Sequence, residues 1–131
     1  MGQINTFTLA LDTNIVIPYL DKDPAVIERL TQWRELGVMF LLPAMVEAEV
    51  LAFRGYADAE RTDAEVFLEG NFLFVPFDRE ITRTAATIRR TTNLKLPDAA
   101  IAATAIAWRA PLVTRNVHDF EKIPGLHILT T

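Results

Sequence analysis

The chain has 131 residues, of which 50% are hydrophobic and 23% are charged, so it is long enough to bury a hydrophobic core. We expect a single domain over residues 1–131. The absence of cysteine excludes disulfides and thiolate metal sites. A net charge of −4 is not the basic excess typical of nucleic-acid binders. Four arginines within residues 79–90 form either a local basic face or an ordinary solvated helix face.

We expect neither a targeting signal nor a membrane-spanning segment in this sequence. The longest apolar runs, such as residues 38–46, are too short to cross a bilayer. Residues 1–14 contain neither a basic segment nor a small-residue cleavage site, so we expect no signal peptide. These features predict a cytoplasmic protein that does not associate with membranes.

The first third of the chain predicts two strands separated by two helices. Residues 6–12 are expected to form a strand and residues 13–20 a short helix. Asp23 and Pro24 are a good cap and first-turn pair for a helix over 24–36, which Gly37 ends. A buried strand over 38–42 follows. The expected apolar stripe of the second helix is Val26, Ile27, Leu30, Trp33 and Leu36.

The middle of the chain continues the alternation. A helix over 43–56 is expected to place Met45, Val46, Val50 and Phe53 on one side. The charged passage 57–65 leads into a short helix near 62–69, and residues 71–77 read as the third strand. Asp78 then caps a helix over 79–91.

The last third begins with an alanine-rich helix over 97–110, which Pro97 opens. Residues 111–114 are the fourth expected strand, 116–120 a turn, and 126–129 a short fifth strand. Strands that alternate with helices are typical of an α/β domain with a mostly parallel sheet and helices on both faces.

Four carboxylates fall where such a sheet binds ligands, outside the carboxyl ends of its strands. Asp12 ends the first strand, and Asp119 follows the fourth. Glu49 lies two turns into the helix after the second strand, and Asp98 lies in the first turn of the alanine-rich helix. We therefore expect these acids to converge at one edge.

Converging carboxylates repel one another unless a cation is present. Mg²⁺ and Mn²⁺ prefer carboxylate and water oxygens, and such an ion attracts phosphate esters and activates water. Each acid also has a simpler interpretation. Asp12 and Asp98 fit helix-start positions and Asp119 fits a turn, whereas Glu47 is the better candidate than Glu49 for a solvated acid.

Four segments resemble the PIN domain family, and most of all the VapC-type toxins of toxin–antitoxin systems. The segments are "LALDTNIVI", "EAEVL", "LPDAAIAATAI" and "LVTRNVHDFEKIPGL". The resemblance implies a three-layer sandwich, with a central sheet of four to five strands between helices. It also implies an endoribonuclease in which Asp12, Glu49, Asp98 and Asp119 bind Mg²⁺ or Mn²⁺ and support hydrolysis of RNA phosphodiester bonds.

The resemblance also assigns supporting roles. Asn14, Thr114 and Asn116 are expected to be polar residues that orient water or ligands, and Arg115 is a candidate contact for a substrate phosphate. Val46 departs from the family, which has a small polar residue at this position. Whether one or two metals bind, and whether Asn116 or Asp119 does more at the metal, stays open.

Partners are likewise implied by the resemblance: an RNA substrate, an antitoxin protein in a hydrophobic groove beside the active site, and a second copy in a homodimer. Trp33, Phe53 and Tyr56 are candidate groove residues, and Trp108 is a candidate dimer contact; aromatic residues of this kind are more often part of a core.

Two other phosphoryl-transfer families fit these residues less well. Haloacid-dehalogenase-like phosphatases carry a second aspartate two residues after the first, where this chain has Asn14. Receiver domains carry an acid pair after the first strand and a lysine far downstream; this chain has a single acid after its first strand, and none of its three lysines is suitably placed. Two alternatives within the same fold stay open: an RNA-processing nuclease outside a toxin system, and a non-catalytic binding module.

Overall fold

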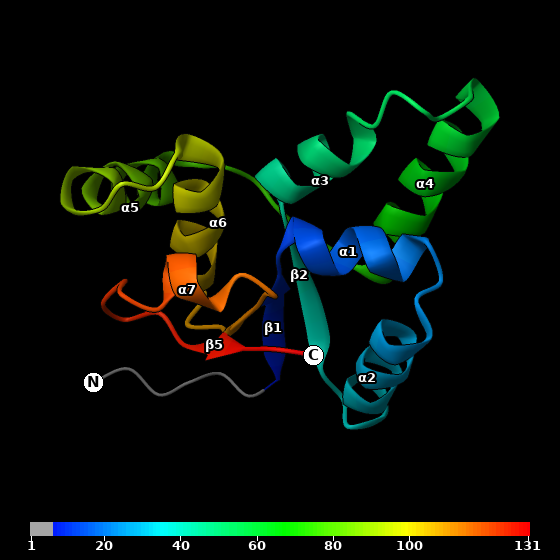
Figure 1. The fold of residues 1–131 in the computed structure, drawn as a ribbon, viewed down its shortest axis with the longest axis horizontal. Helices are drawn as coiled ribbons and strands as arrows, with labels where there is room; N and C mark the ends of the chain where they lie inside the picture. Colours follow the sequence, from blue (N-terminus) through cyan, green and yellow to red (C-terminus); the bar gives the residue numbers. More distant parts are fainter. Residues whose placement is uncertain (1–6) are drawn as a thin grey trace.

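Five parallel strands form the central sheet of the computed structural model, which describes residues 7–131 (Figure 1). The strands lie in the order β3-β2-β1-β4-β5, and all four neighbouring pairs are parallel. Their bounds are β1 Thr8–Leu11, β2 Met39–Pro43, β3 Leu73–Val75, β4 Leu112–Val113 and β5 Ile128–Leu129. The predicted α/β class and parallel sheet are confirmed. Thr6, with which the first strand was expected to begin, lies outside the described residues.

Helices cover both faces of the sheet, as the three-layer expectation requires. Figure 1 shows α5, α6 and α7 on one side of the strands and α1, α2 and α4 on the other. The helices are α1 Thr13–Leu20, α2 Pro24–Glu35, α3 Ala44–Leu51, α4 Asp58–Asn71, α5 Arg79–Thr91, α6 Leu96–Ala107 and α7 Val117–Phe120. Because every strand runs in the same direction, the carboxyl ends of β1, β2 and β4 lie at one edge, where α1, α3 and α7 begin.

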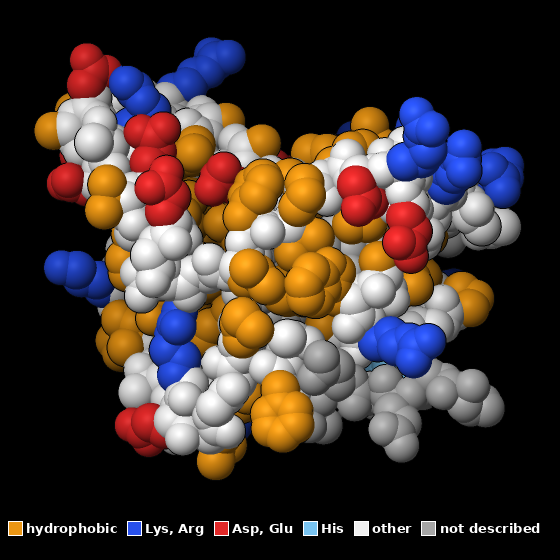
Figure 2. Space-filling model, turned by 180° about the vertical axis from the view of Figure 1, so that it is seen from behind, with side chains coloured by type: hydrophobic (Ala, Val, Ile, Leu, Met, Phe, Trp, Pro, Cys, Tyr) orange, Lys and Arg blue, Asp and Glu red, His pale blue; other side chains and the backbone are white. Residues whose placement is uncertain are grey.

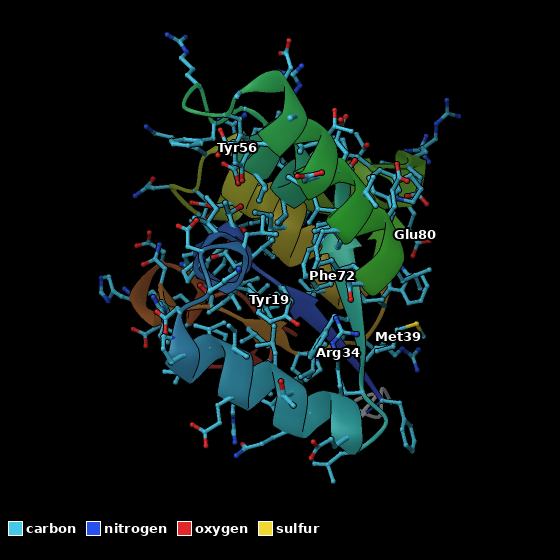
Figure 3. All side chains as sticks on the ribbon, turned by 90° about the vertical axis from the view of Figure 1, so that its right-hand side faces the viewer. Tyr19, Arg34, Met39, Tyr56, Phe72 and Glu80 are labelled. Atoms are coloured by element: carbon cyan, nitrogen blue, oxygen red, sulfur yellow. The ribbon has the colours of Figure 1, made fainter. Side chains whose placement is uncertain are left out.

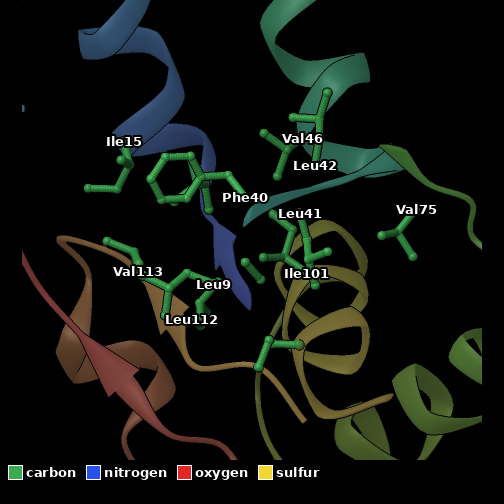
Figure 4. Packing of buried hydrophobic residues seen from close by; sticks show 14 of the residues in the cluster. Leu9, Ile15, Phe40, Leu41, Leu42, Val46, Val75, Ile101, Leu112 and Val113 are labelled. Carbon is green, nitrogen blue, oxygen red and sulfur yellow. The ribbon is translucent and has the colours of Figure 1, made fainter. Parts of the chain in front are cut away.

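The core forms between these layers. All four residues of β1 are buried, as in parallel strands covered on both faces. Figure 4 shows Ile101 of α6 beside Leu41 of β2, and Ile15 of α1 beside Phe40 on the opposite face of the same strand. Residues 99–105 of α6 are all buried. Because most of them are alanines, this helix can approach the sheet closely.

An arginine joins α2 to the end of α4. The Arg34 guanidinium lies 4.7 Å from the ring centre of Phe40 and 5.7 Å from that of Phe72, and it donates a 2.8 Å hydrogen bond to the carbonyl oxygen of Asn71. Figure 3 shows Arg34 and Phe72 in the space between the two helices. Stacking on aromatic faces and capping a helix carbonyl both stabilise this junction.

The chain between β2 and β3 differs from the prediction. Helix α3 ends at Leu51, and the side chain of Phe53 is 61% exposed, not packed on a helix face. Helix α4 runs from Asp58 to Asn71, so it begins earlier and is longer than the short helix expected near 62–69. The Glu60 carboxylate accepts the Ala57 N–H at 2.9 Å, which satisfies a donor at the helix start. The acids of this passage therefore start a helix.

Other boundaries also differ. Leu36, predicted to lie on the apolar stripe of α2, is the residue after the helix and is 74% exposed. Residues 117–120, predicted as a turn, form the single helical turn α7. Strands β3, β4 and β5 are each shorter than expected because ladder pairing covers only two or three of their residues.

The surface carries an apolar area at the centre of the face turned away from the viewer in Figure 1, with charged side chains on both sides of it (Figure 2). The edge strand β3 exposes Leu73 and Phe74. Within the described residues, no helix is long and apolar enough to cross a membrane.

Candidate active site at the carboxyl ends of the strands

Asp12 is the buried acid of the site. Its side chain follows β1 and is only 5% exposed. One carboxylate oxygen accepts the Thr13 N–H at 2.7 Å, and the other accepts the Thr114 hydroxyl at 2.7 Å. Burial raises the pKa of Asp12, the two hydrogen bonds oppose that rise, and the charge of Glu49 adds to it. Asp12 thus caps α1 and also supplies the innermost carboxylate of the site.

A polar network holds Asp12 in place. The Thr114 hydroxyl, which is fully buried, accepts the Asn116 N–H at 2.9 Å and the Asn14 side-chain amide at 3.3 Å while it donates to Asp12. The Asn14 carbonyl oxygen accepts the Arg115 N–H at 3.1 Å. The loop after β4 is therefore bound to the start of α1, and all three expected supporting polar residues lie beside Asp12.

Glu49 reaches the same place from α3. Its carboxylate accepts the Thr13 hydroxyl at 2.5 Å. Thr13 was not predicted as a site residue, although its place directly after Asp12 at the start of α1 was the available signal. The expectation that Glu47 is the solvated acid was wrong. Glu47 is half-buried, and burial together with the nearby Glu65 and Glu69 raises its pKa, whereas Glu49 is exposed.

Asp98 and Asp119 complete the acidic set. Asp98 lies in the first turn of α6. Burial is the largest cause of its raised pKa, the charges of Asp12, Glu49 and Asp119 raise the pKa further, and Lys95 opposes the rise. Asp119, in α7, accepts the Asn116 side-chain amide at 2.6 Å. The four acids that were far apart in sequence therefore share one electrostatic field.

These carboxylates suit a hard cation by their chemistry. Mg²⁺ and Mn²⁺ prefer oxygen ligands, and neither ion needs nitrogen or sulfur. A bound cation would also relieve the repulsion between the carboxylates. In residues 7–131, no three Asp, Glu or His side chains lie close enough together to hold one ion. Mg²⁺ usually keeps several waters and takes only one or two protein carboxylates, so the donor set fits such an ion.

Comparison with known proteins agrees with this geometry. The profile of the PIN domain matches residues 9–126. The chain belongs to the PIN domain family. Ribonuclease VapC1 of Rickettsia felis is 30% identical, over 93% of this chain and 95% of the relative. A toxin–antitoxin complex from Klebsiella pneumoniae contains a chain with 28% identity and a TM-score of 0.77, over 93% of this chain and 96% of that one.

The fold also matches VapBC2 from Rickettsia felis, solved bound to a DNA fragment from its promoter. The TM-score is 0.82 at 22% identity, over 95% of this chain and 98% of that one. This PIN domain therefore has the architecture of the VapBC toxin–antitoxin structures, as the sequence resemblance implied.

Three of the four acids of this PIN domain line an open cleft, called the acidic cleft below, whereas Asp119 lines a neighbouring one. Asp12, Glu49 and Asp98 line the acidic cleft together with Thr13, Asn14 and Asn116. Arg115 also lines the cleft, and its guanidinium lies 3.4 Å from the Asp23 carboxylate at the start of α2. Arg115 is therefore near the acids, as a phosphate contact would require, but it is paired with Asp23.

The three aromatic candidates for a partner groove differ in burial: Trp33 is buried, whereas Phe53 is exposed and packs edge-on against Tyr56. Trp33 is 9% exposed and belongs to the core, where its ring packs edge-on against Phe40, so the alternative interpretation of this residue as part of the core holds. Tyr56 does line a cleft between α1, α2 and α4, beside Tyr19 and Phe67. Figure 3 shows Tyr19 and Tyr56 on this side of the molecule.

Proposed function

We propose that this PIN domain protein is a metal-dependent endoribonuclease and the toxin of a toxin–antitoxin pair. The observation that carries the proposal is the convergence of Asp12, Glu49, Asp98 and Asp119 in one electrostatic field at the carboxyl edge of the sheet. The 30% identity to a protein named Ribonuclease VapC1 supports RNA as the substrate. The likeness to a chain of a toxin–antitoxin complex supports the toxin role.

One or two of the four carboxylates, together with water, would hold Mg²⁺ or Mn²⁺. When bound, the ion supplies a Lewis acid that polarises the phosphate and lowers the pKa of water. Thr114 and Thr13 serve this arrangement by fixing Asp12 and Glu49 with hydrogen bonds of 2.7 and 2.5 Å. Fixed donors cost no reorganisation when the substrate arrives.

The hydrolytic step follows from these positions. A water oxygen attacks the phosphorus in line, the bond from phosphorus to the leaving oxygen breaks, and that oxygen takes a proton from solvent. One carboxylate of the site accepts the proton that the attacking water loses.

The proposal includes two protein partners. An antitoxin is expected because a similar chain occurs in a toxin–antitoxin complex. The cleft lined by Tyr19, Tyr56 and Phe67 is the candidate groove for this partner. The second proposed partner is another copy of this chain, in a homodimer, and the proposed location is the cytoplasm. Trp108, half-exposed after α6, stays a candidate dimer contact.

The test is cleavage of a mixed panel of structured and single-stranded RNAs by the purified protein with Mg²⁺, with Mn²⁺, and with excess chelator. The proposal predicts cutting with either metal and none with chelator. Cutting that persists in chelator would contradict metal dependence. Absence of cutting together with absence of Mn²⁺ binding would contradict the enzyme itself and leave a PIN-fold binding module. Inhibition by the product of an adjacent small gene separates a toxin from an RNA-processing nuclease.

A further inference from the structure

A second cleft, of about 640 Å³, opens beside the acidic cleft, between the α5–α6 connection and α7. Lys95 and Lys122 line it, with Asp98 and Asp119 at its acidic end. Because Asp98 lines both clefts, the two hollows meet at this residue. The second hollow is called the lysine cleft below. No motif of the sequence pointed to it, because its lysines are 27 positions apart.

The lysines are free to meet an anion. In the described part of the chain, neither Lys95 nor Lys122 forms an ion pair, whereas Arg115 on the far side of the acids is paired with Asp23. Lys95 lies near enough to the acids to lower the pKa of Asp98. The lysine cleft therefore offers unpaired positive charge directly beside the carboxylates.

The backbone that carries Lys95 is already organised. The Thr92 hydroxyl donates to the Ile88 carbonyl oxygen at 2.8 Å and accepts the Leu94 N–H at 3.2 Å. The Arg89 side chain donates to the Leu94 carbonyl oxygen at 3.3 Å. This connection is bound to the end of α5, so little ordering remains to oppose ligand binding.

We propose that the lysine cleft binds the phosphates of the RNA strand next to the bond that is cut. The inference rests on the proposed function and adds the position of the RNA strand relative to the acidic cleft. A protein with net charge −4 and four clustered acids repels a polyanion, so affinity has to come from local cations. Phosphate contacts of this kind position the strand without reading its sequence.

The experiment measures binding of a fluorescent single-stranded RNA of mixed sequence, about 20 nucleotides long, by anisotropy in chelator over a range of salt. The variants are Lys95→Gln and Lys122→Gln. Lys22→Gln is the matched control, because it removes the same charge from the third lysine of the chain, which lies between α1 and α2. We expect each cleft variant to weaken Kd about fivefold near 0.1 M salt and to reduce the salt slope by about 0.7. Lys22→Gln changes neither, and Lys95→Arg restores binding.

Equal weakening by all three glutamine variants would overturn the inference, since only net charge would then matter. Unchanged binding by the cleft variants, or no RNA binding by the unaltered protein, would overturn it as well. The proposed function fails separately. If the protein cuts RNA but the cleft variants bind normally, the nuclease stands and the strand path is wrong. If it never cuts but the cleft variants lose binding, the cleft stands without the enzyme.

Discussion

Replacing Thr114 with valine tests whether the polar network holds Asp12. The change keeps the shape of a fully buried side chain and removes a hydroxyl that donates to Asp12 at 2.7 Å and accepts from Asn116 and Asn14. A hydrogen bond to a charged group contributes about 1.5–3 kcal/mol, and an unpaired buried donor costs about 1–3 kcal/mol. We therefore expect Thr114→Val to lower the free energy of unfolding by about 2–4 kcal/mol at pH 7.

The matched control is Thr114→Ser, which keeps the hydroxyl and loses one buried methyl group, at a cost of about 1 kcal/mol. Urea unfolding followed by circular dichroism in chelator measures both variants. RNA cleavage with metal is measured on the same preparations, and Thr114→Val should lose more activity than Thr114→Ser. If the two variants unfold at the same urea concentration, the hydroxyl does not stabilise Asp12 and the reasoning fails.

Three further predictions concern stability. Asp98→Asn should raise the free energy of unfolding at pH 7 but not at pH 3. The pKa of Asp98 is raised in the folded state, so the stability that its protonated form contributes is fully present below the unfolded pKa and is lost as pH rises through the folded pKa. Urea unfolding in chelator at both pH values tests this, and an equal change at both values contradicts it. Ala102→Leu should destabilise by about 1–3 kcal/mol by overpacking α6, while Ala86→Leu, on the exposed face of α5, should change thermal unfolding little. Arg34→Met should cost about 1–2 kcal/mol, because it loses the stacking on two rings and the hydrogen bond to Asn71; unchanged thermal unfolding would contradict that role.

The sequence predicted the parts of this fold that depend on local pattern. The apolar run before Asp12 indicated a buried strand because parallel strands are covered on both faces. The positions of Asp12 and Asp98 at a strand end and a helix start indicated one shared edge because all parallel strands end on the same side. Both inferences needed only neighbours along the chain and the topology of the sheet.

What could not be predicted depends on contacts between distant segments. Trp33 was a candidate for either a groove or the core, and its packing against Phe40 places it in the core. Glu47 was expected in solvent, but α4 folds back and brings Glu65 and Glu69 toward it. The meeting of Lys95 and Lys122 likewise follows from the packing of α5, α6 and α7.

The most direct test of the account compares RNA cleavage by the unaltered protein, by Asp98→Asn and by Asp58→Asn in Mn²⁺ and in chelator. Asp58→Asn is the matched control because it makes the same chemical change at an exposed residue, whose ion pair with Arg61 lies at the surface. We expect metal-dependent cutting by the unaltered protein and by Asp58→Asn, and none by Asp98→Asn, whose fold stays intact. Full activity of Asp98→Asn would contradict the assignment of these acids as the catalytic centre.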